Sequence, residues 1–308
     1  MSTLFNEDRY HALNLGDGQT VLRAHAHDDS GRVIGELSGV LDGEALVNGF
    51  SAPFGGLDLA RPRETPANVS STVEQSLRHF RDAGVGLVRI RLPPACYGEN
   101  ESLIQFTLLN SGFAVEHCEL NQHIDLSGLS TPEDYVAQLK SPARRALLRP
   151  DGQELRLIEA EADHEWDRAY ATLETNRAAR GRRLSLSLDY VKRARATLGA
   201  RVRMFELLDG DRAVAAALVY LVRDRRELVV AWGDGDHGRE HSPMNVLAYR
   251  VVERALADGV LTLDLGISNE HEPSADGGLV PNSGLVQFKQ SVLARIEPRL
   301  TLVRELSR

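Results

Sequence analysis

One lysine near the C-terminus is the residue whose type is most unusual for this chain. Of 36 lysine and arginine residues, only three are lysines, at positions 140, 192 and 289. Lys289 follows Phe288 in a short predicted helix, beyond a strand pattern and a polar loop. Where arginine is so strongly favoured, a lysine indicates a need for a compact ammonium in place of a planar guanidinium. The alternative is a solvated helix residue, since lysine is mostly exposed in folded proteins.

The strand pattern before that loop carries further candidates. Residues 261–266 alternate leucine with Thr262 and Asp264 and stop at Gly266, which predicts a half-buried strand. Ligands bind in the crevice beyond the carboxyl ends of strands in α/β sheets, so Gly266 and Ser268 are expected binding residues. Asp264 is a candidate general base at the mouth of this crevice. The alternative is that its carboxylate caps a neighbouring backbone group.

The most basic local cluster consists of Arg144, Arg145 and Arg149, in and after a predicted helix that Pro142 should break or kink. Guanidinium groups bind phosphate and carboxylate bidentately, so one interpretation is an anion clamp. The other is a solvated helix face or a set of interdomain ion pairs.

A turn in the first half also has binding potential. Phe54 and Gly55 lie in the segment 51–57, where two adjacent glycines follow a Pro-Phe pair. Adjacent glycines allow positive φ or close approach of the backbone to a ligand. The alternative is an ordinary turn at the end of a strand.

Two clusters rich in histidine and acids suggest metal ligands at first sight. His237, Glu240 and His241 form one, and residues 270–276 form the other. The first lies in a loop ahead of a helix, with no third ligand evident beside the pair of histidines, whereas protein metal sites need three or four ligands. A solvated acidic loop is the better interpretation of the second. We therefore expect no metal.

Composition limits the class of protein. The chain has 308 residues, 42% hydrophobic, with a net charge of −8, which argues against broad nucleic-acid or membrane-surface binding. Cys96 and Cys118 form neither a disulfide framework nor a metal motif, and are expected to be reduced thiols in a cytoplasmic protein. Residues 1–8 lack a signal-peptide pattern, and no apolar run is long enough to span a membrane.

The predicted elements repeat. Residues 19–126 read β-β-β-α-β-α-β, and residues 155–304 read β-α-α-β-β-β-α-β-α-β. In both halves an amphipathic helix and a glycine stop precede an alternating strand, at 74–90 and at 248–264. The pattern predicts an α/β fold with mixed (α+β) sheets in two tandem domains. The expected divisions are a first domain at 1–130 without the two opening helices, a basic connecting helix at 131–152 and a full domain at 153–308.

The order of the second half resembles the GNAT acyltransferase fold, and more closely its FemAB-like, tandem-GNAT branch. The segments that carry the resemblance are 141–149, 213–218, 243–247 and 264–289. The resemblance implies transfer of an acyl or aminoacyl group to an amine. It further implies that Lys289 stabilises charge on the carbonyl oxygen, that Phe288 lines the acyl pocket, and that Asn245 and Trp232 contribute to substrate binding.

The resemblance leaves the donor open between acyl-CoA and aminoacyl-tRNA. GNAT enzymes bind pyrophosphate on a glycine-rich turn before the third helix. Here residues 234–243 carry three acids and a proline, which weakens the case for coenzyme A and suits relatives that use aminoacyl-tRNA. The expected acceptor is a small molecule or a cell-envelope precursor. The alternatives are a catalytically inactive binding module with the tandem fold and, against the net charge, an RNA-binding protein that uses the arginine cluster.

Overall fold

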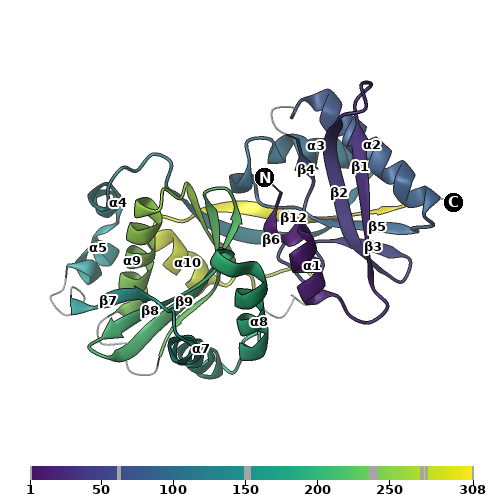
Figure 1. Cartoon of the computed structure of the whole chain (residues 1–308). Helices are drawn as coiled ribbons and strands as arrows, with labels where there is room; N and C mark the ends of the chain where they lie inside the picture. Colours follow the sequence, from purple (N-terminus) through teal and green to yellow (C-terminus); the bar gives the residue numbers. More distant parts are fainter. Residues whose placement is uncertain are drawn as a thin grey trace. The chain divides into compact units, whose positions relative to one another are not determined.

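The computed structural model describes residues 2–60, 64–148, 154–235, 242–270, 274 and 277–306. The chain forms two compact units (Figure 1). Unit 1 comprises residues 1–121, 271–280 and 297–308, and unit 2 comprises residues 122–270 and 281–296.

Unit 1 is built on a mixed sheet in the order β1-β2-β3-β5-β12-β6, with β4 paired to β2. Of these strands, β3 and β5 are parallel, and helix α2 connects them. The elements are η1 (Leu4–Asn6), α1 (Asp8–Asn14), β1 (Thr20–His27), β2 (Val33–Asp42), β3 (Ala45–Asn48), β4 (Asp58–Leu59), α2 (Pro66–Asp82), β5 (Leu87–Arg91), η2 (Ala95–Tyr97), α3 (Glu101–Asn110), β6 (Ala114–Asp125) and β12 (Arg295–Glu305).

Unit 2 repeats this plan in the order β6-β11-β10-β9-β8-β7. Its parallel pair is β10 and β11, which helix α9 connects. The elements are α4 (Pro132–Gln138), α5 (Ser141–Leu147), β7 (Arg156–Glu159), α7 (Asp163–Ala178), α8 (Leu188–Leu198), η3 (Gly199–Arg201), β8 (Val202–Asp209), β9 (Arg212–Arg223), β10 (Arg226–Asp234), α9 (Pro243–Ala257), β11 (Thr262–Ile267) and α10 (Ser283–Ser291). The mixed α/β fold and its internal repeat are therefore confirmed.

In each half of the sequence, the last strand lies beside a strand from the parallel pair of the other half. Strand β12 at the end of the chain pairs with β5, and β6 from the first half neighbours β11. A single cut of the chain thus cannot separate the compact units. The expected boundaries at 130 and 152 follow sequence order and stay a prediction.

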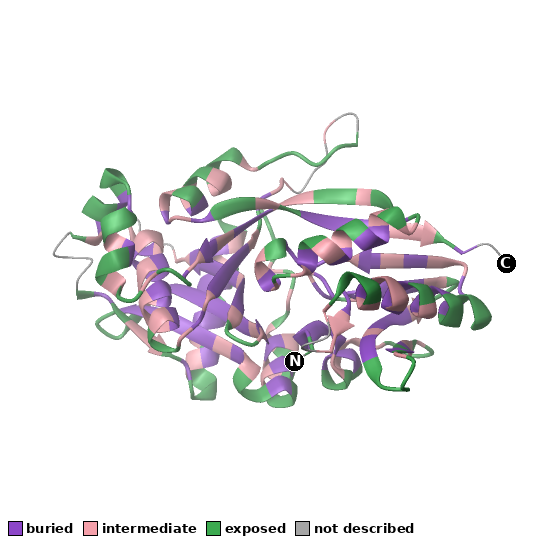
Figure 2. Cartoon of the chain, turned by 90° about the horizontal axis from the view of Figure 1, so that it is seen from above, coloured by how far each residue is buried: buried purple, intermediate pink, exposed green. Residues whose placement is uncertain are grey.

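The core of unit 1 shows why its main helix forms where it does. Thr65 caps the N-terminus of α2, and Pro66 occupies the first turn, where a missing N–H costs nothing. The predicted stripe of Val73, Leu77 and Phe80 is buried against the sheet. Figure 2 shows such buried stripes on helices whose other faces are exposed. Each side chain of this kind contributes about 1.5–3 kcal/mol by leaving water.

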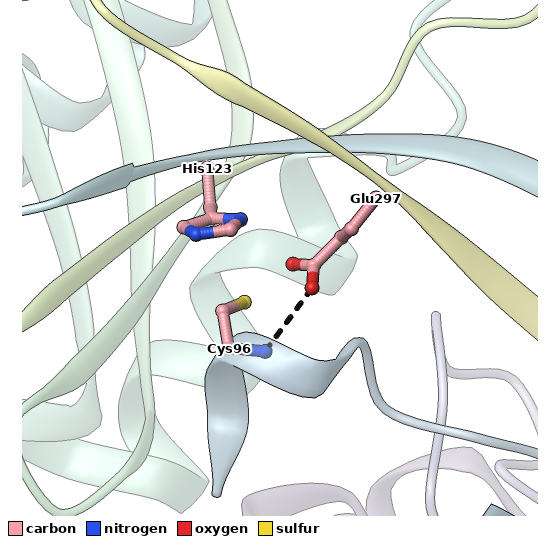
Figure 3. A group of neighbouring side chains, drawn as sticks. All are labelled: Cys96, His123 and Glu297. Atoms are coloured by element: carbon pink, nitrogen blue, oxygen red, sulfur yellow. Dashed lines mark hydrogen bonds between the residues drawn. The ribbon is translucent and has the colours of Figure 1, made fainter. Parts of the chain in front are cut away.

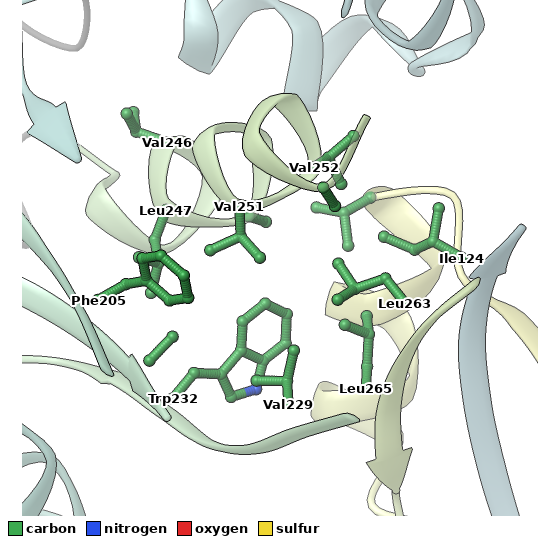
Figure 4. Close-up of a cluster of buried hydrophobic side chains, with 14 of the residues drawn as sticks. Ile124, Phe205, Val229, Trp232, Val246, Leu247, Val251, Val252, Leu263 and Leu265 are labelled. Atoms are coloured by element: carbon green, nitrogen blue, oxygen red, sulfur yellow. The ribbon is translucent and has the colours of Figure 1, made fainter. Parts of the chain in front are cut away.

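The core of unit 2 lies between α9 and the sheet (Figure 4). Strand β9 is paired on both sides, with β8 and β10, and most of its residues are buried. Its nearly all-apolar sequence predicts this central position, because such a strand is covered on both faces. On α9, Leu247, Val251 and Ala255 are fully buried, as their spacing predicts.

Two local features differ from the predicted elements. A short helix, α1, precedes β1 in unit 1, where unit 2 has the longer pair α7 and α8. The single helix expected from Thr131 onward is two helices, since Leu139 and Lys140 adopt extended backbone between α4 and α5. Pro142 lies in the first turn of α5, so it acts at a helix start rather than as a kink.

Replacing Gly233 by alanine is expected to destabilise unit 2 by about 1–3 kcal/mol through overpacking. A Cβ at Gly233 would lie 2.4 Å from Cγ and 2.7 Å from Cβ of Asn176, whose amide donates to the carbonyl oxygen of Asp234. Gly235→Ala is the matched control, because its Cβ would meet nothing closer than 3.7 Å. Urea denaturation measures both variants, and equal stabilities would contradict the argument.

Candidate active site

The central feature of unit 2 is a parallel ladder that ends early. Strands β10 and β11 pair only from Arg226 to Leu228 and from Thr262 to Asp264, although both strands continue for several described residues. Strand β10 has a register irregularity against β9 between Val229 and Ala231. A bulge of this kind bends a strand and often marks a site of function. Beyond Leu228, facing backbone groups of β10 and β11 are therefore not ladder partners.

Lys289 holds the end of β11. Its ammonium donates to the carbonyl oxygens of Gly266 and Ile267, both at 2.9 Å, and only 1% of the residue is exposed. Gly266 has φ +72°, a conformation that glycine adopts without strain. This turn lets two successive carbonyls reach one ammonium group. The alternative of a solvated helix residue is excluded.

Asp264 is fully buried, and its Oδ1 accepts a hydrogen bond of 2.8 Å from the backbone N–H of Gly266. This contact agrees with the interpretation that the carboxylate caps a neighbouring backbone group. A role for Asp264 as general base stays a prediction.

A buried polar network continues from the strand end. The Ser268 hydroxyl donates to Gln122 Oε1 at 2.7 Å, and Gln122 Nε2 donates to the carbonyl oxygen of Val286 at 3.3 Å. The carbonyl oxygen of Ser268 accepts from the N–H of Asn282, which caps α10. Sequence reasoning identified Ser268 but missed Gln122. Nothing in the extended segment around Gln122 indicates that its amide has a partner elsewhere in the chain.

An apolar wall lies next to Lys289. The rings of Trp232 and Phe288 are 5.5 Å apart at an interplanar angle of 59°. Trp232 is buried among the side chains of the unit 2 core (Figure 4), whereas Phe288 is half-buried. The ends of β10, β11 and α10 thus bring together Trp232, Phe288, Lys289 and Gly266, residues from separate predicted segments.

The predicted anion clamp is positioned on α5. Arg144 and Arg145 are exposed, and neither side chain forms a hydrogen bond or ion pair within the described part of the chain. Arg149 lies outside the described residues. Ala143 and Ala146 are buried where α5 packs on α9. The exposed guanidinium groups fit either a clamp or a solvated face.

Asn245 lies in the first turn of α9, half-buried. Its N–H donates to the carbonyl oxygen of Ser242 at 3.0 Å. Ser242 occupies the N-cap position with Pro243 after it, but its hydroxyl forms no capping hydrogen bond and its φ is +51°.

Sequence reasoning missed Arg177, which lies in a basic group at the C-terminal end of α7. Arg177 forms no side-chain hydrogen bond or ion pair with the described residues, although its side chain is half-buried. Burial lowers the pKa of Arg177, and the charges of Arg180 and Arg182 lower it further. Arg180 Nη2 lies 3.8 Å from Asp234 Oδ1 at the end of β10. The basic group is therefore near the part of β10 that is not paired with β11. Its members are too irregularly spaced for sequence to indicate a shared function.

Phe54 and Gly55 belong to unit 1, whereas the other predicted site residues belong to unit 2. Phe54 is fully buried between the rings of Phe5 and Tyr97. A Cβ at Gly55 would lie 2.6 Å from Asn48 Oδ1, so glycine is required there by packing.

Both cysteines are free thiols. In unit 1 the backbone N–H of Cys96 donates to the carboxylate of Glu297 at 3.3 Å (Figure 3). The histidines and acids considered as metal ligands at 237–241 and at 271, 272 and 276 lie outside the described residues. Within the described ranges, none of the helices has the length and apolarity needed to cross a bilayer.

Comparisons with known proteins agree with this geometry. Residues 137–273 match the family model described as "Acetyltransferase (GNAT) domain". The crystal structure of FemX superposes with a TM-score of 0.70 at 11% identity, over 98% of this chain and 92% of FemX. For the C-terminal domain of a putative lysylphosphatidylglycerol synthetase from Agrobacterium fabrum the TM-score is 0.59 at 13% identity, over 99% and 88%. A tandem GNAT protein from the clavulanic acid biosynthesis pathway gives 0.52 at 12%, over 96% and 85%. The comparison with curated proteins found no match.

Residues 137–273 are therefore similar in sequence to a GNAT acetyltransferase domain. The whole chain has the tandem GNAT fold, in the FemAB-like form that FemX represents, as the resemblance predicted.

Proposed function

We propose that this protein is an N-acyltransferase or aminoacyltransferase that moves an acyl group from an activated donor to an amine. The observation that supports the proposal most is the early end of the β10–β11 ladder beside the Trp232–Phe288 wall. Strand edges without ladder partners offer backbone N–H and C=O groups to an extended ligand. The thioester-bearing arm of an acyl-CoA and the ester of an aminoacyl-tRNA can both present a carbonyl there.

Each residue then has a chemical task. Trp232 and Phe288 exclude water from the acyl group, which strengthens electrostatic interactions with the carbonyl oxygen. Lys289 positions the strand end through Gly266 and Ile267. Arg144, Arg145 and the basic end of α7 suit the phosphate or carboxylate groups of a donor or acceptor.

The donor test compares acetyl-CoA with aminoacyl-tRNA, using a panel of small amines and cell-envelope precursors that carry an amine. The relatives FemX and lysylphosphatidylglycerol synthetase are the reason to retain aminoacyl donors. Transfer to any amine supports the proposal. Thermal stabilisation by a donor without turnover across the panel would favour the inactive binding module instead.

Phe288→Ala is expected to lower kcat/KM by about tenfold or more, because water enters beside the acyl group. The matched control is Phe106→Ala, since Phe106 is 63% exposed on α3, belongs to unit 1 and has no role in the proposed acyl pocket. Steady-state rates and thermal melts of both variants decide the result. Unchanged kcat/KM in a folded Phe288→Ala protein would remove Phe288 from the site.

A further inference from the structure

Unit 1 contains a cavity of about 460 Å³ that the proposed acyl transfer does not use. It lies over strands β3, β5 and β12 and the loop after β3. Its polar lining consists of Ser51, Arg89, Arg91, His117 and Thr301 together with the carboxylates of Asp42 and Glu116. The argument rests on Ser51, Arg91 and Thr301, because Glu116 is paired with Arg89. Pockets of this size in proteins hold small molecules.

The three arginines on this face of the sheet differ in their partners. Arg89 forms two hydrogen bonds of 2.7 Å with Glu116, and Arg299 donates to Glu119 at 2.9 and 2.7 Å. Arg91 forms no ion pair within the described part of the chain; its Nη1 donates to the carbonyl oxygens of Gly49 and Ala52. One positive charge therefore lacks a carboxylate partner.

Burial adds to the electrostatic cost of this charge. Burial lowers the pKa of Arg91 and the neighbouring guanidinium of Arg299 lowers that pKa further, while the carboxylates of Glu119 and Glu116 oppose the shift only in part. A cation removed from water is stabilised when an anion with matching hydrogen-bond acceptors binds to it. The remaining N–H groups of Arg91, on Nε and Nη2, form no hydrogen bond with described residues.

The loop that borders the cavity is held in a strained conformation. Ser51 has φ +54°, which is unfavourable for a residue with a Cβ. The Tyr10 hydroxyl donates to the carbonyl oxygen of Ser51 at 2.7 Å, and Arg91 holds the carbonyls on either side. Strain that surrounding contacts maintain in this way is frequent at ligand sites.

We propose that this cavity binds an oxyanion, the phosphoryl or carboxylate group of a small polar ligand, on the guanidinium of Arg91, with the hydroxyls of Ser51 and Thr301 as further donors. The cavity is larger than one such group, so the body of the ligand occupies the rest. The site does not depend on acyl transfer, since all its residues belong to unit 1.

Binding of inorganic phosphate and of acetate to the full chain tests the proposal, by calorimetry at constant ionic strength with chloride as the reference anion. The wild type is expected to bind one of the two anions with one-to-one stoichiometry, and which one binds distinguishes a phosphoryl from a carboxylate ligand. Arg91→Gln is expected to weaken binding about tenfold or more. Arg78→Gln is the matched control, an exposed arginine on α2 in the same unit, and should bind as the wild type does.

Because Arg91 also holds the loop, a second variant separates binding from folding. Ser51→Gly removes the hydroxyl and relieves the positive φ, so it should weaken anion binding several-fold without lowering Tm. Absence of one-to-one binding by the wild type would overturn the proposal. So would wild-type affinity in both Arg91→Gln and Ser51→Gly, or equal losses in Arg78→Gln and Arg91→Gln.

Discussion

Replacing Lys289 by methionine is expected to destabilise the folded protein by about 2–4 kcal/mol, since two carbonyl oxygens at the end of β11 lose the charged donor that the buried ammonium supplies. Methionine has a similar length and no donor, so the carbonyl oxygens of Gly266 and Ile267 are left without this partner. Urea denaturation measures the loss. Lys140→Met is the matched control, because Lys140 is exposed and its ammonium forms no hydrogen bond or ion pair within the described residues. A change within about 0.5 kcal/mol is expected there.

The same variant separates two roles of Lys289. If the ammonium also stabilises charge on the carbonyl oxygen, acyl transfer should fall about 10²–10³-fold, which is the usual effect of removing one such donor. The rate must be measured at a temperature where Lys289→Met is fully folded. A folded variant with wild-type kcat would contradict the catalytic role and leave the positioning role intact. A small destabilisation with a large loss of kcat would contradict the positioning role.

Local pattern predicted much of the fold. The burial of α2 and α9 follows from apolar residues at helical spacing, and the central place of β9 follows from its apolar run. The exchange of β6 and β12 between the repeats could not be predicted, because strand partners are chosen by tertiary packing. A stretch such as 114–125 can be recognised as extended from its sequence, but its sequence does not show which strands it will pair with.

The candidate site was predicted in part. Lys289 was identified because lysine is rare in this chain, and Gly266 and Ser268 were identified because they lie at and after the end of a predicted strand. It could not show that Lys289 is buried, since its burial depends on the left-handed turn at Gly266, 23 residues earlier. Gln122 was missed for a related reason: its hydrogen-bond partners, Ser268 and Val286, are distant in sequence.

The second large effect is expected at the paired end of the β10–β11 ladder. Arg254 on α9 forms two hydrogen bonds, of 2.7 and 2.6 Å, with Glu227 on β10, which is 2% exposed. Arg254→Met leaves this carboxylate buried without its main partner, and the expected loss of stability is about 3–5 kcal/mol. Arg203, with Nη1 3.8 Å from Glu227, offsets part of that loss.

A double variant isolates the interaction. Glu227→Leu with Arg254→Met removes both charges, and replacing a buried pair by apolar side chains is often neutral, so most of the lost stability should return. Arg193→Met serves as the control, since its pair with Asp189 is exposed and should contribute about 0.3–0.5 kcal/mol. A loss below about 1 kcal/mol in Arg254→Met would show that water reaches Glu227. The pair joins α9 to the part of β10 that is hydrogen-bonded to β11. The double variant should therefore leave the unpaired ends of β10 and β11 unchanged, and any acyl transfer activity should be retained.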